Sequence, residues 1–276
     1  MSVIAIIGAG ALGSALAHKL AARGRTREIR LIDPEETAAR GKALDILQSG
    51  PVEGFSAALS AHASIHAAAG ADAIVIADSV SGSEHAGEAG LSLIRQLHAA
   101  GSSSPIVFAG TAQRELMMRC LRELHLPPGR LVGSAPAALG SALRALCALV
   151  IDTSPVEISL QVVGVPPRRA VVAWEEAAAA GEPLTALMGA HEIGAVAARI
   201  PSLWPPGPYA LASAAARIAE ALCVGSRRRY SCFVDIGRGR VAAMPVELGR
   251  GGVKRIVEPT LSPQERTRFD TAVEEL

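Results

Sequence analysis

Aromatic side chains are scarce in this chain: Phe, Trp and Tyr together make up 3% of its 276 residues. A core of normal size must therefore be built from Ala, Val, Leu and Ile, since 50% of the residues are hydrophobic. The chain also lacks an excess of charge of either sign, because its net charge is +1. This balance argues against disorder and against nucleic acid as the main partner.

Long apolar runs and paired cysteines are missing as well. No stretch reaches the length of a membrane span, and the apolar start lacks the basic segment of a secretory signal, so no membrane partner is expected. The four cysteines stand far apart, without metal-site spacing, at Cys120, Cys147, Cys223 and Cys232. They indicate the reduced core thiols of a cytoplasmic protein that has no metal site.

What the chain does contain is a glycine turn between an apolar segment and a helical pattern. Residues 2–7 are mainly apolar, and Gly8, Gly10 and Gly13 follow them. Gly8 permits the tight turn out of a strand, and Gly10 lets the backbone approach a pyrophosphate. Gly13 lets the next helix pack close to the sheet. This spacing predicts a dinucleotide-binding turn.

The residues around the turn supply the rest of that pattern. The N–H groups near Ala11 and Leu12 begin the helix, where they face the phosphates with the positive end of the helix dipole. Asp33 ends the next apolar segment, 28–32, where its carboxylate can accept both ribose hydroxyls and repel a 2′-phosphate. NAD is therefore favoured over NADP. The alternative is an ordinary strand–turn–helix corner whose glycines serve packing alone.

Short apolar runs alternate with helical patterns in the first half, which predicts a Rossmann-type, doubly wound parallel sheet. Its strands are expected at 2–7, 28–32, 55–60, 74–77, 105–108 and 131–132, with helices at 36–48, 86–100 and 112–125. The second half predicts an α+β region with antiparallel strands. Its helices are expected at 136–149, 183–200 and 208–223, its strands at 156–163, 230–236, 240–246 and 253–257, and a last helix behind a capping box at 262–265.

Two longer segments carry a family resemblance. Gly41–Gly54 and Met244–Val253, together with the glycine turn, resemble the malate/lactate dehydrogenases, and the similarity extends over nearly the whole chain. The resemblance implies an NAD-binding Rossmann domain at 1–134 and an α+β substrate-type domain at 135–276. It also implies a homo-oligomer, dimer or tetramer, formed through helices such as 36–48. The cofactor contacts that it implies are Gly8, Gly10, Ala11, Leu12, Gly13, Asp33 and Ala77.

The chain departs from the family at the positions that carry the chemistry. Pro166 stands where the family has its proton-transferring His, Leu139 where it has the Asp that orients this His, and Ala142 where it has the Arg that binds the substrate carboxylate. The loop 78–87 is short and has no arginine. We therefore expect no catalytic residues of the family type, and a catalytically impaired or inactive chain that still binds NAD(H).

Three residues remain as candidates for other roles. His85 is either a stand-in for the lost His or a solvated loop histidine. Arg168 and Arg169 either attract a small acidic ligand or are exposed charges at a strand end. These residues support one alternative, a divergent NAD-dependent oxidoreductase of a small 2-hydroxy or 2-oxo acid with a rebuilt active site. The other alternative is a relic without ligand that serves protein–protein association.

Asp78 replaces a glycine that the family has after its fourth strand. Directed at the pyrophosphate, its carboxylate adds like charge and weakens dinucleotide binding. Directed to solvent, or capping the following turn, it has no such effect.

Overall fold

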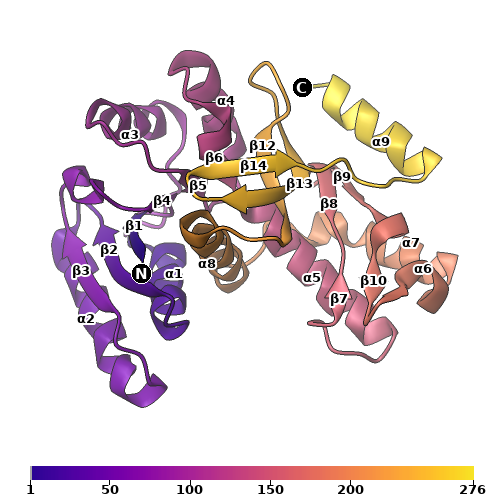
Figure 1. Cartoon of the computed structure of the whole chain (residues 1–276), viewed down its shortest axis with the longest axis horizontal. Helices are drawn as coiled ribbons and strands as arrows, with labels where there is room; N and C mark the ends of the chain where they lie inside the picture. The colour runs from indigo at the N-terminus through magenta and orange to yellow at the C-terminus, as the bar shows by residue number, and fades with distance from the viewer. Residues whose placement is uncertain (1) are drawn as a thin grey trace.

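The computed structural model describes residues 2–276 and contains one large mixed sheet with helices packed on both faces (Figure 1). Six parallel strands form its first part, in the order β3-β2-β1-β4-β5-β6. They are β1 (Ser2–Ile7), β2 (Thr26–Ile32), β3 (Ala58–His62), β4 (Ala73–Ile76), β5 (Ile106–Phe108) and β6 (Leu131–Gly133). The helices between them are α1 (Ala11–Ala22), α2 (Glu36–Glu53), α3 (Gly87–Ala99) and α4 (Arg114–Glu123), with short 3₁₀ turns η1 (Ile65–Ala68) and η2 (Pro128–Arg130). The predicted doubly wound sheet is confirmed.

The strand order places the switch point of the sheet, where a binding crevice is expected, beside the glycine turn. β1 pairs in parallel with β2 on one side and with β4 on the other. From β1 to β3 the chain adds strands towards one edge of the sheet, and from β4 to β6 it adds them towards the other edge. Ligands of such sheets bind at this switch point, outside the carboxyl ends of the strands. The residues that follow β1 and β4 are Gly8 and Ala77, and both therefore lie at the crevice.

Strands from the second half continue the same sheet in antiparallel fashion. β12 pairs with β6 where Phe233 lies opposite Gly133, and the order continues β12-β13-β8-β9, with β14 on β13. The strands are β8 (Val162–Val165), β9 (Arg169–Val172), β12 (Arg229–Asp235), β13 (Val241–Gly249) and β14 (Gly252–Ile256), while β7 (Ile158–Ser159), β10 (Ala178–Ala179) and β11 (Glu182–Pro183) form a separate small sheet. The helices are α5 (Ala135–Val150), α6 (Leu184–Leu187), α7 (Ala190–Ala198), α8 (Pro208–Val224) and α9 (Pro263–Glu274), with η3 (Trp174–Glu176) and η4 (Ile200–Leu203).

Several elements differ from the sequence expectation. The strand expected at 156–163 is interrupted, because β7 belongs to the small sheet and β8 to the large one. The strand expected at 55–60 lies at Ala58–His62, and the helix expected at 36–48 continues to Glu53, where Gly54 ends it in the left-handed conformation. β9, β10 and β11 were not expected. The capping box at Ser262 and Glu265 is present at the start of α9.

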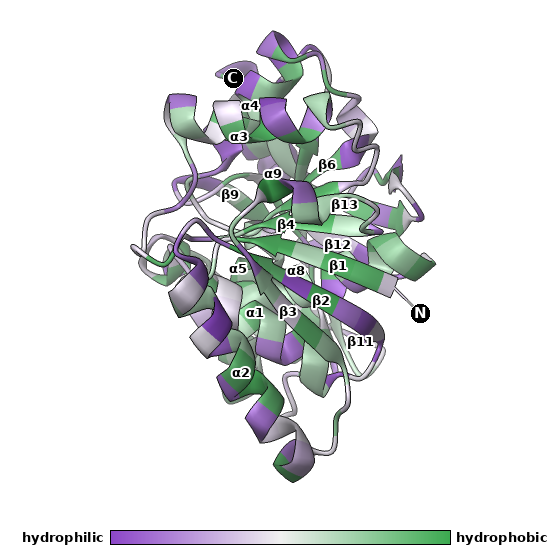
Figure 2. Ribbon diagram, turned by 90° about the vertical axis from the view of Figure 1, so that its left-hand side faces the viewer, coloured by the Kyte–Doolittle hydropathy of each residue, from purple (hydrophilic) through white to green (hydrophobic). Residues whose placement is uncertain are grey.

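The core is aliphatic, as the shortage of aromatics requires. β1 and β4 contribute fully buried isoleucines, and Figure 2 shows these central strands as mainly hydrophobic. α8, from the second half of the chain, packs against α1, α5 and the sheet, so one core extends across both halves. A partly buried ion pair reinforces this contact: Arg23 at the end of α1 donates to both carboxylate oxygens of Glu220 on α8, at 2.7 and 2.6 Å.

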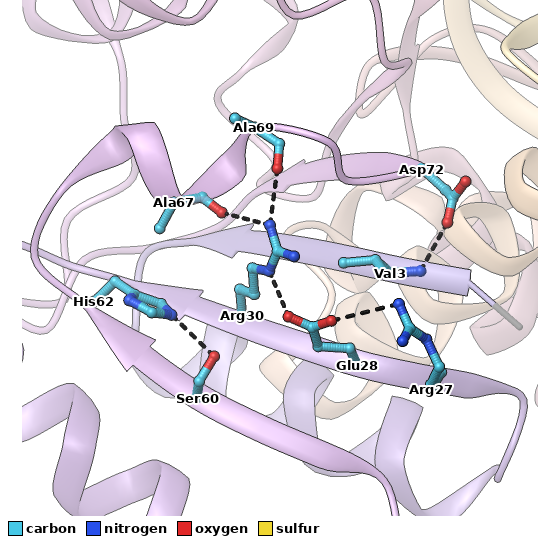
Figure 3. A network of polar contacts seen from close by, with 9 residues as sticks. All are labelled: Val3, Arg27, Glu28, Arg30, Ser60, His62, Ala67, Ala69 and Asp72. Atoms are coloured by element: carbon cyan, nitrogen blue, oxygen red, sulfur yellow. Dashed lines mark hydrogen bonds and ion pairs between the residues drawn. The ribbon is translucent and has the colours of Figure 1, made fainter.

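A polar network on β2 holds the connection that crosses from β3 to β4 (Figure 3). The Arg30 guanidinium donates to the carbonyl oxygens of Ala67 and Ala69 at 3.0 and 2.8 Å, and to Glu28 at 2.6 Å. Asp72, just before β4, accepts a bond from the N–H of Val3. These contacts hold β4 in place beside β1, where the crevice forms.

All four cysteines are unpaired and buried, so the prediction that they are core thiols is confirmed. Burial raises the pKa of Cys120 to about 12 and the pKa values of Cys147 and Cys223 to about 11. Within residues 2–276, no helix combines the length and apolar character that crossing a bilayer requires.

Candidate nucleotide-binding site

The glycine turn brings the end of β1 and the start of α1 into close contact. A Cβ atom at Gly13 would lie 2.0 Å from the carbonyl oxygen of Gly8. The helix therefore starts closer to the strand than any other residue type permits. This is the close helix–sheet packing that the spacing predicts for a dinucleotide turn.

A carboxylate of this same chain lies on the helix start. Asp78, immediately after Ala77, accepts the N–H of Leu12 at 3.2 Å and the N–H of Gly13 at 2.9 Å. A Cβ atom at Gly10 would lie 2.3 Å from the Asp78 carboxyl carbon, so the turn closes tightly over this side chain. The structure thus decides between the two orientations of Asp78: it points at the N–H groups that a pyrophosphate would use.

The carboxylate of Asp33 also accepts hydrogen bonds from backbone N–H groups. Its side chain is 1% exposed and accepts the N–H of Ala9 at 2.9 Å, of Val80 at 2.9 Å and of Glu35 at 3.0 Å. A carboxylate offers about four acceptor positions, so about one remains. The predicted role, accepting two ribose hydroxyls at once, needs one position more than this arrangement leaves.

A third carboxylate binds the turn after β5. Glu84 accepts the N–H of Thr111 at 3.0 Å and the N–H of Ala112 at 2.9 Å. A Cβ atom at Gly110 would lie 2.2 Å from a Glu84 carboxylate oxygen, which shows how close the contact is. By the family resemblance this turn replaces one that touches substrate and nicotinamide.

Residues 78–84 thus form a short strap across the crevice. Asp78 and Glu84 face each other in an antiparallel bridge, and Ser79 N–H donates to the carbonyl oxygen of Ser83 at 2.9 Å. One end of the strap binds α1 and the other binds the turn 110–112, while Val80 reaches Asp33. The sequence revealed the strap's length and lack of arginine, but not its contacts.

Two buried polar atoms beside the strap have no hydrogen-bond partner among residues 2–276. They are Nε2 of His85, which follows the strap, and Nε2 of Gln113, whose Oε1 accepts the N–H of Gly110. Burial lowers the pKa of His85, against the opposing effect of the Asp33 and Asp78 carboxylates. The structure therefore places His85 at the nucleotide crevice, beside the carboxylates at the glycine turn.

The three positions where the resemblance places the family's catalytic groups are apolar and mostly buried. Pro166 follows β8 and is buried, Leu139 on α5 belongs to a second core cluster, and Ala142 lies one turn further along α5. Arg168 and Arg169 are exposed, and Arg169 forms an ion pair with Glu275 at the end of α9.

The structure also brings together a basic cleft from separate segments of the chain, to which the sequence run Arg227–Arg229 contributes two residues. Its volume is about 840 Å³, and it lies between α1, α5, α8 and β12. Its basic side chains are Lys19, Arg23, Arg144, Arg217, Arg228 and Arg229. Burial and the neighbouring Arg217 both lower the pKa of Arg144. The sequence does not show that these residues form one site, because they are far apart in the chain and become neighbours only when α5 packs against α8.

Potential metal ligands do not gather in the described part of the chain. Among residues 2–276 no three His, Cys, Asp or Glu side chains are grouped so that they could hold an ion.

The parallel sheet, its switch point and the glycine turn define a dinucleotide-binding protein of the Rossmann class, and comparison with known proteins identifies the family. Residues 2–96 match the model of the lactate/malate dehydrogenase NAD-binding domain. The malate dehydrogenase of Thermomicrobium roseum is 31% identical over 301 residues, covering 99% of this chain and 96% of that protein. The malate dehydrogenase of Roseobacter denitrificans is 30% identical over 298 residues, covering 98% and 93%. The chain belongs to the NAD-dependent lactate/malate dehydrogenase family.

Solved structures agree on the fold. A minor L-lactate dehydrogenase from Enterococcus mundtii superposes with a TM-score of 0.87 at 18% identity, covering 99% of this chain and 96% of that one. The malate dehydrogenase of Picrophilus torridus in its apo form gives 0.85 at 21% identity, covering 99% and 94%.

The family match supports NAD as the cofactor, and the glycine turn allows the close approach of helix and strand that a dinucleotide site needs. The turn from Gly8 to Gly13 and the start of α1 would hold the diphosphate, and Asp33 the adenosine ribose. NAD would supply a hydride-accepting nicotinamide. The N–H groups at the start of α1 are, however, already bound by Asp78, so the fit requires the strap to move.

Proposed function

We propose that this chain binds NAD(H) on its Rossmann half without carrying out the dehydrogenation of malate or lactate. The single observation that carries the proposal is the buried Pro166 at the position of the family's proton-transferring His. Proline has no titratable group, so it can neither take nor give the proton that accompanies hydride transfer.

The surroundings offer no replacement for this group. Leu139 is fully buried among apolar neighbours, and Ala142 has no charge with which to bind a substrate carboxylate. The rebuilt-site alternative depends on His85, whose Nε2 is buried and whose pKa is lowered by burial, which disfavours the charged ring that would donate a proton. These features support a binding protein more than a divergent oxidoreductase.

Turnover with NADH tests the proposal directly. General acid–base catalysis contributes about 10²–10⁴-fold and a lost electrostatic contact about 10²–10³-fold. With oxaloacetate or pyruvate, we therefore expect kcat/KM at least about 10⁴-fold below that of the Thermomicrobium roseum relative measured side by side. The decay of NADH absorbance gives the rate. Activity near that of the relative contradicts the proposal, and its loss in His85→Ala would establish the rebuilt site.

Binding is measured separately by thermal shift. A ligand present at a hundred times its dissociation constant stabilises the folded chain by about 2.7 kcal/mol. We expect stabilisation by NADH and less by NADPH, because the Asp33 carboxylate repels a 2′-phosphate. If neither nucleotide shifts the melting temperature at millimolar concentration, the alternative of a chain without ligand that serves protein–protein association is favoured.

We also propose that the chain self-associates through α2. The support is an exposed apolar strip on this helix: Leu44 is 54% exposed and Leu47, one turn further on, is 38% exposed. We expect Leu44→Lys combined with Leu47→Lys to convert a dimer or larger assembly to a monomer in light scattering. Leu149→Lys, at an 80% exposed site on α5, is the matched control. A monomeric wild-type chain contradicts the proposal.

A further inference from the structure

We propose that the strap, residues 78–84, is a built-in competitor of the dinucleotide that holds the crevice closed until the cofactor displaces it. The inference rests on the proposed function, since it concerns how the same NAD(H) site is opened. Its basis is that one short segment binds three separate parts of the crevice: the start of α1, Asp33 and the turn 110–112.

The first contact places one negative group where another must bind. The N–H groups of Leu12 and Gly13 are the donors at the start of α1, and the Asp78 carboxylate holds both. A phosphate needs the same donors and the same end of the helix dipole. The two anions cannot share them, because each N–H is already bound to an oxygen of the Asp78 carboxylate.

The second contact links the strap to the ribose position. Of the three N–H groups on Asp33, those of Ala9 and Glu35 belong to the fixed frame of the fold, and that of Val80 belongs to the strap. When the N–H of Val80 leaves Asp33, about two acceptor positions of this carboxylate are free. Two is the number that the two hydroxyls of a ribose require. Opening of the strap therefore prepares both ends of the adenosine diphosphate site together.

The third contact closes the far end. Glu84 binds the N–H groups of Thr111 and Ala112, while Nε2 of Gln113 and Nε2 of His85 stay buried without partners. The closed strap therefore satisfies one set of donors and leaves two polar atoms unpaired beside it. Its tip, Ser81, Gly82 and Ser83, is exposed, and the hydrogen bonds between its serine side chains stay within the strap. These features favour a segment that opens without unfolding the sheet.

The affinity of the chain for NADH is then reduced by the fraction of molecules whose strap is open. Asp78→Gly removes the competing carboxylate and installs the residue that the resemblance places here. We expect this variant to bind NADH at least tenfold more tightly than the wild-type chain in calorimetric titration. Asp78→Asn retains one acceptor oxygen without the charge, and we expect an intermediate gain of about threefold. Glu88→Gln removes a carboxylate from the exposed start of α3, outside the crevice contacts, and should leave the dissociation constant unchanged.

Hydrogen exchange gives a readout that does not depend on activity. The amides of Leu12, Gly13 and Val80 should exchange slowly in the free chain. In Asp78→Gly the amides of Leu12 and Gly13 should exchange faster, and NADH should protect them again while exposing Val80. Circular dichroism checks that each variant is folded. If Asp78→Gly does not fold, Glu84→Gln, which loosens the other end of the strap, supplies a second test.

The outcomes separate the two claims. Equal NADH affinity in the wild-type chain, Asp78→Gly and Glu84→Gln overturns the strap as a competitor and leaves the proposed function standing. Absence of NADH binding in all of them overturns the binding function, and the competitor with it. Tighter NADH binding in Asp78→Gly, with an unchanged dissociation constant in Glu88→Gln, supports both the binding function and the strap as a competitor.

Discussion

Gly13→Ala is expected to destabilise the chain by about 3 kcal/mol or more. The added Cβ would lie 2.0 Å from the carbonyl oxygen of Gly8, which is backbone at the end of the central strand. Neither group can give way without separating α1 from the sheet. Urea unfolding of the variant and the wild-type chain measures the difference.

The matched control is Gly41→Ala in α2, where nothing lies within 4 Å of the added Cβ. An alanine there lowers the conformational entropy of the unfolded chain and favours the helix, so we expect a gain of up to about 1 kcal/mol. If both variants change the free energy of unfolding equally, the close contact at Gly13 is not the reason why this position requires glycine.

Asp33→Ala is expected to destabilise the chain by about 3–5 kcal/mol, even without any nucleotide. The substitution leaves three backbone N–H groups, those of Ala9, Glu35 and Val80, without their acceptor. A buried donor that loses its partner costs about 1–3 kcal/mol. The free energy of unfolding in urea, measured without NADH, isolates this structural part.

Asp72→Ala is the matched control for this prediction. Asp72 is exposed and accepts one N–H, that of Val3, so its loss should cost about 1 kcal/mol. Equal losses in the two variants would mean that the three N–H contacts of Asp33 add no more to stability than the single contact of Asp72. A larger loss in Asp33→Ala shows that this carboxylate holds the fold together, a role beyond the ribose contact that the sequence predicts.

Much of the fold could be predicted from the sequence, because its signals are local. The glycine spacing before α1, the buried runs of β1 and β4 and the capping box at Ser262 each depend on a few consecutive residues, and each lies where it was expected. The interrupted strand at 156–163 could not be predicted, since β7 and β8 pair with partners in different sheets. Strand pairing is decided by distant segments, which a local pattern does not contain.

The candidate site divides in the same way. Gly8 to Gly13, Asp33 and the replacement by Pro166 can be read directly, because residue type and spacing alone carry them. The strap and the basic cleft around Arg144 and Arg217 cannot, because their residues meet only after α1, α5, α8 and the loop after β4 have packed.

By itself, the sequence indicated a dinucleotide turn and a resemblance to the malate/lactate dehydrogenases, and it has Pro166 where this resemblance places their proton-transferring His. Only the tertiary structure decided what occupies the turn. Asp78 is separated from Leu12 by 66 residues, and its carboxylate reaches the start of α1 because β4 lies beside β1. A helix start binds whichever anion the fold brings to it, and here the fold brings one from its own chain.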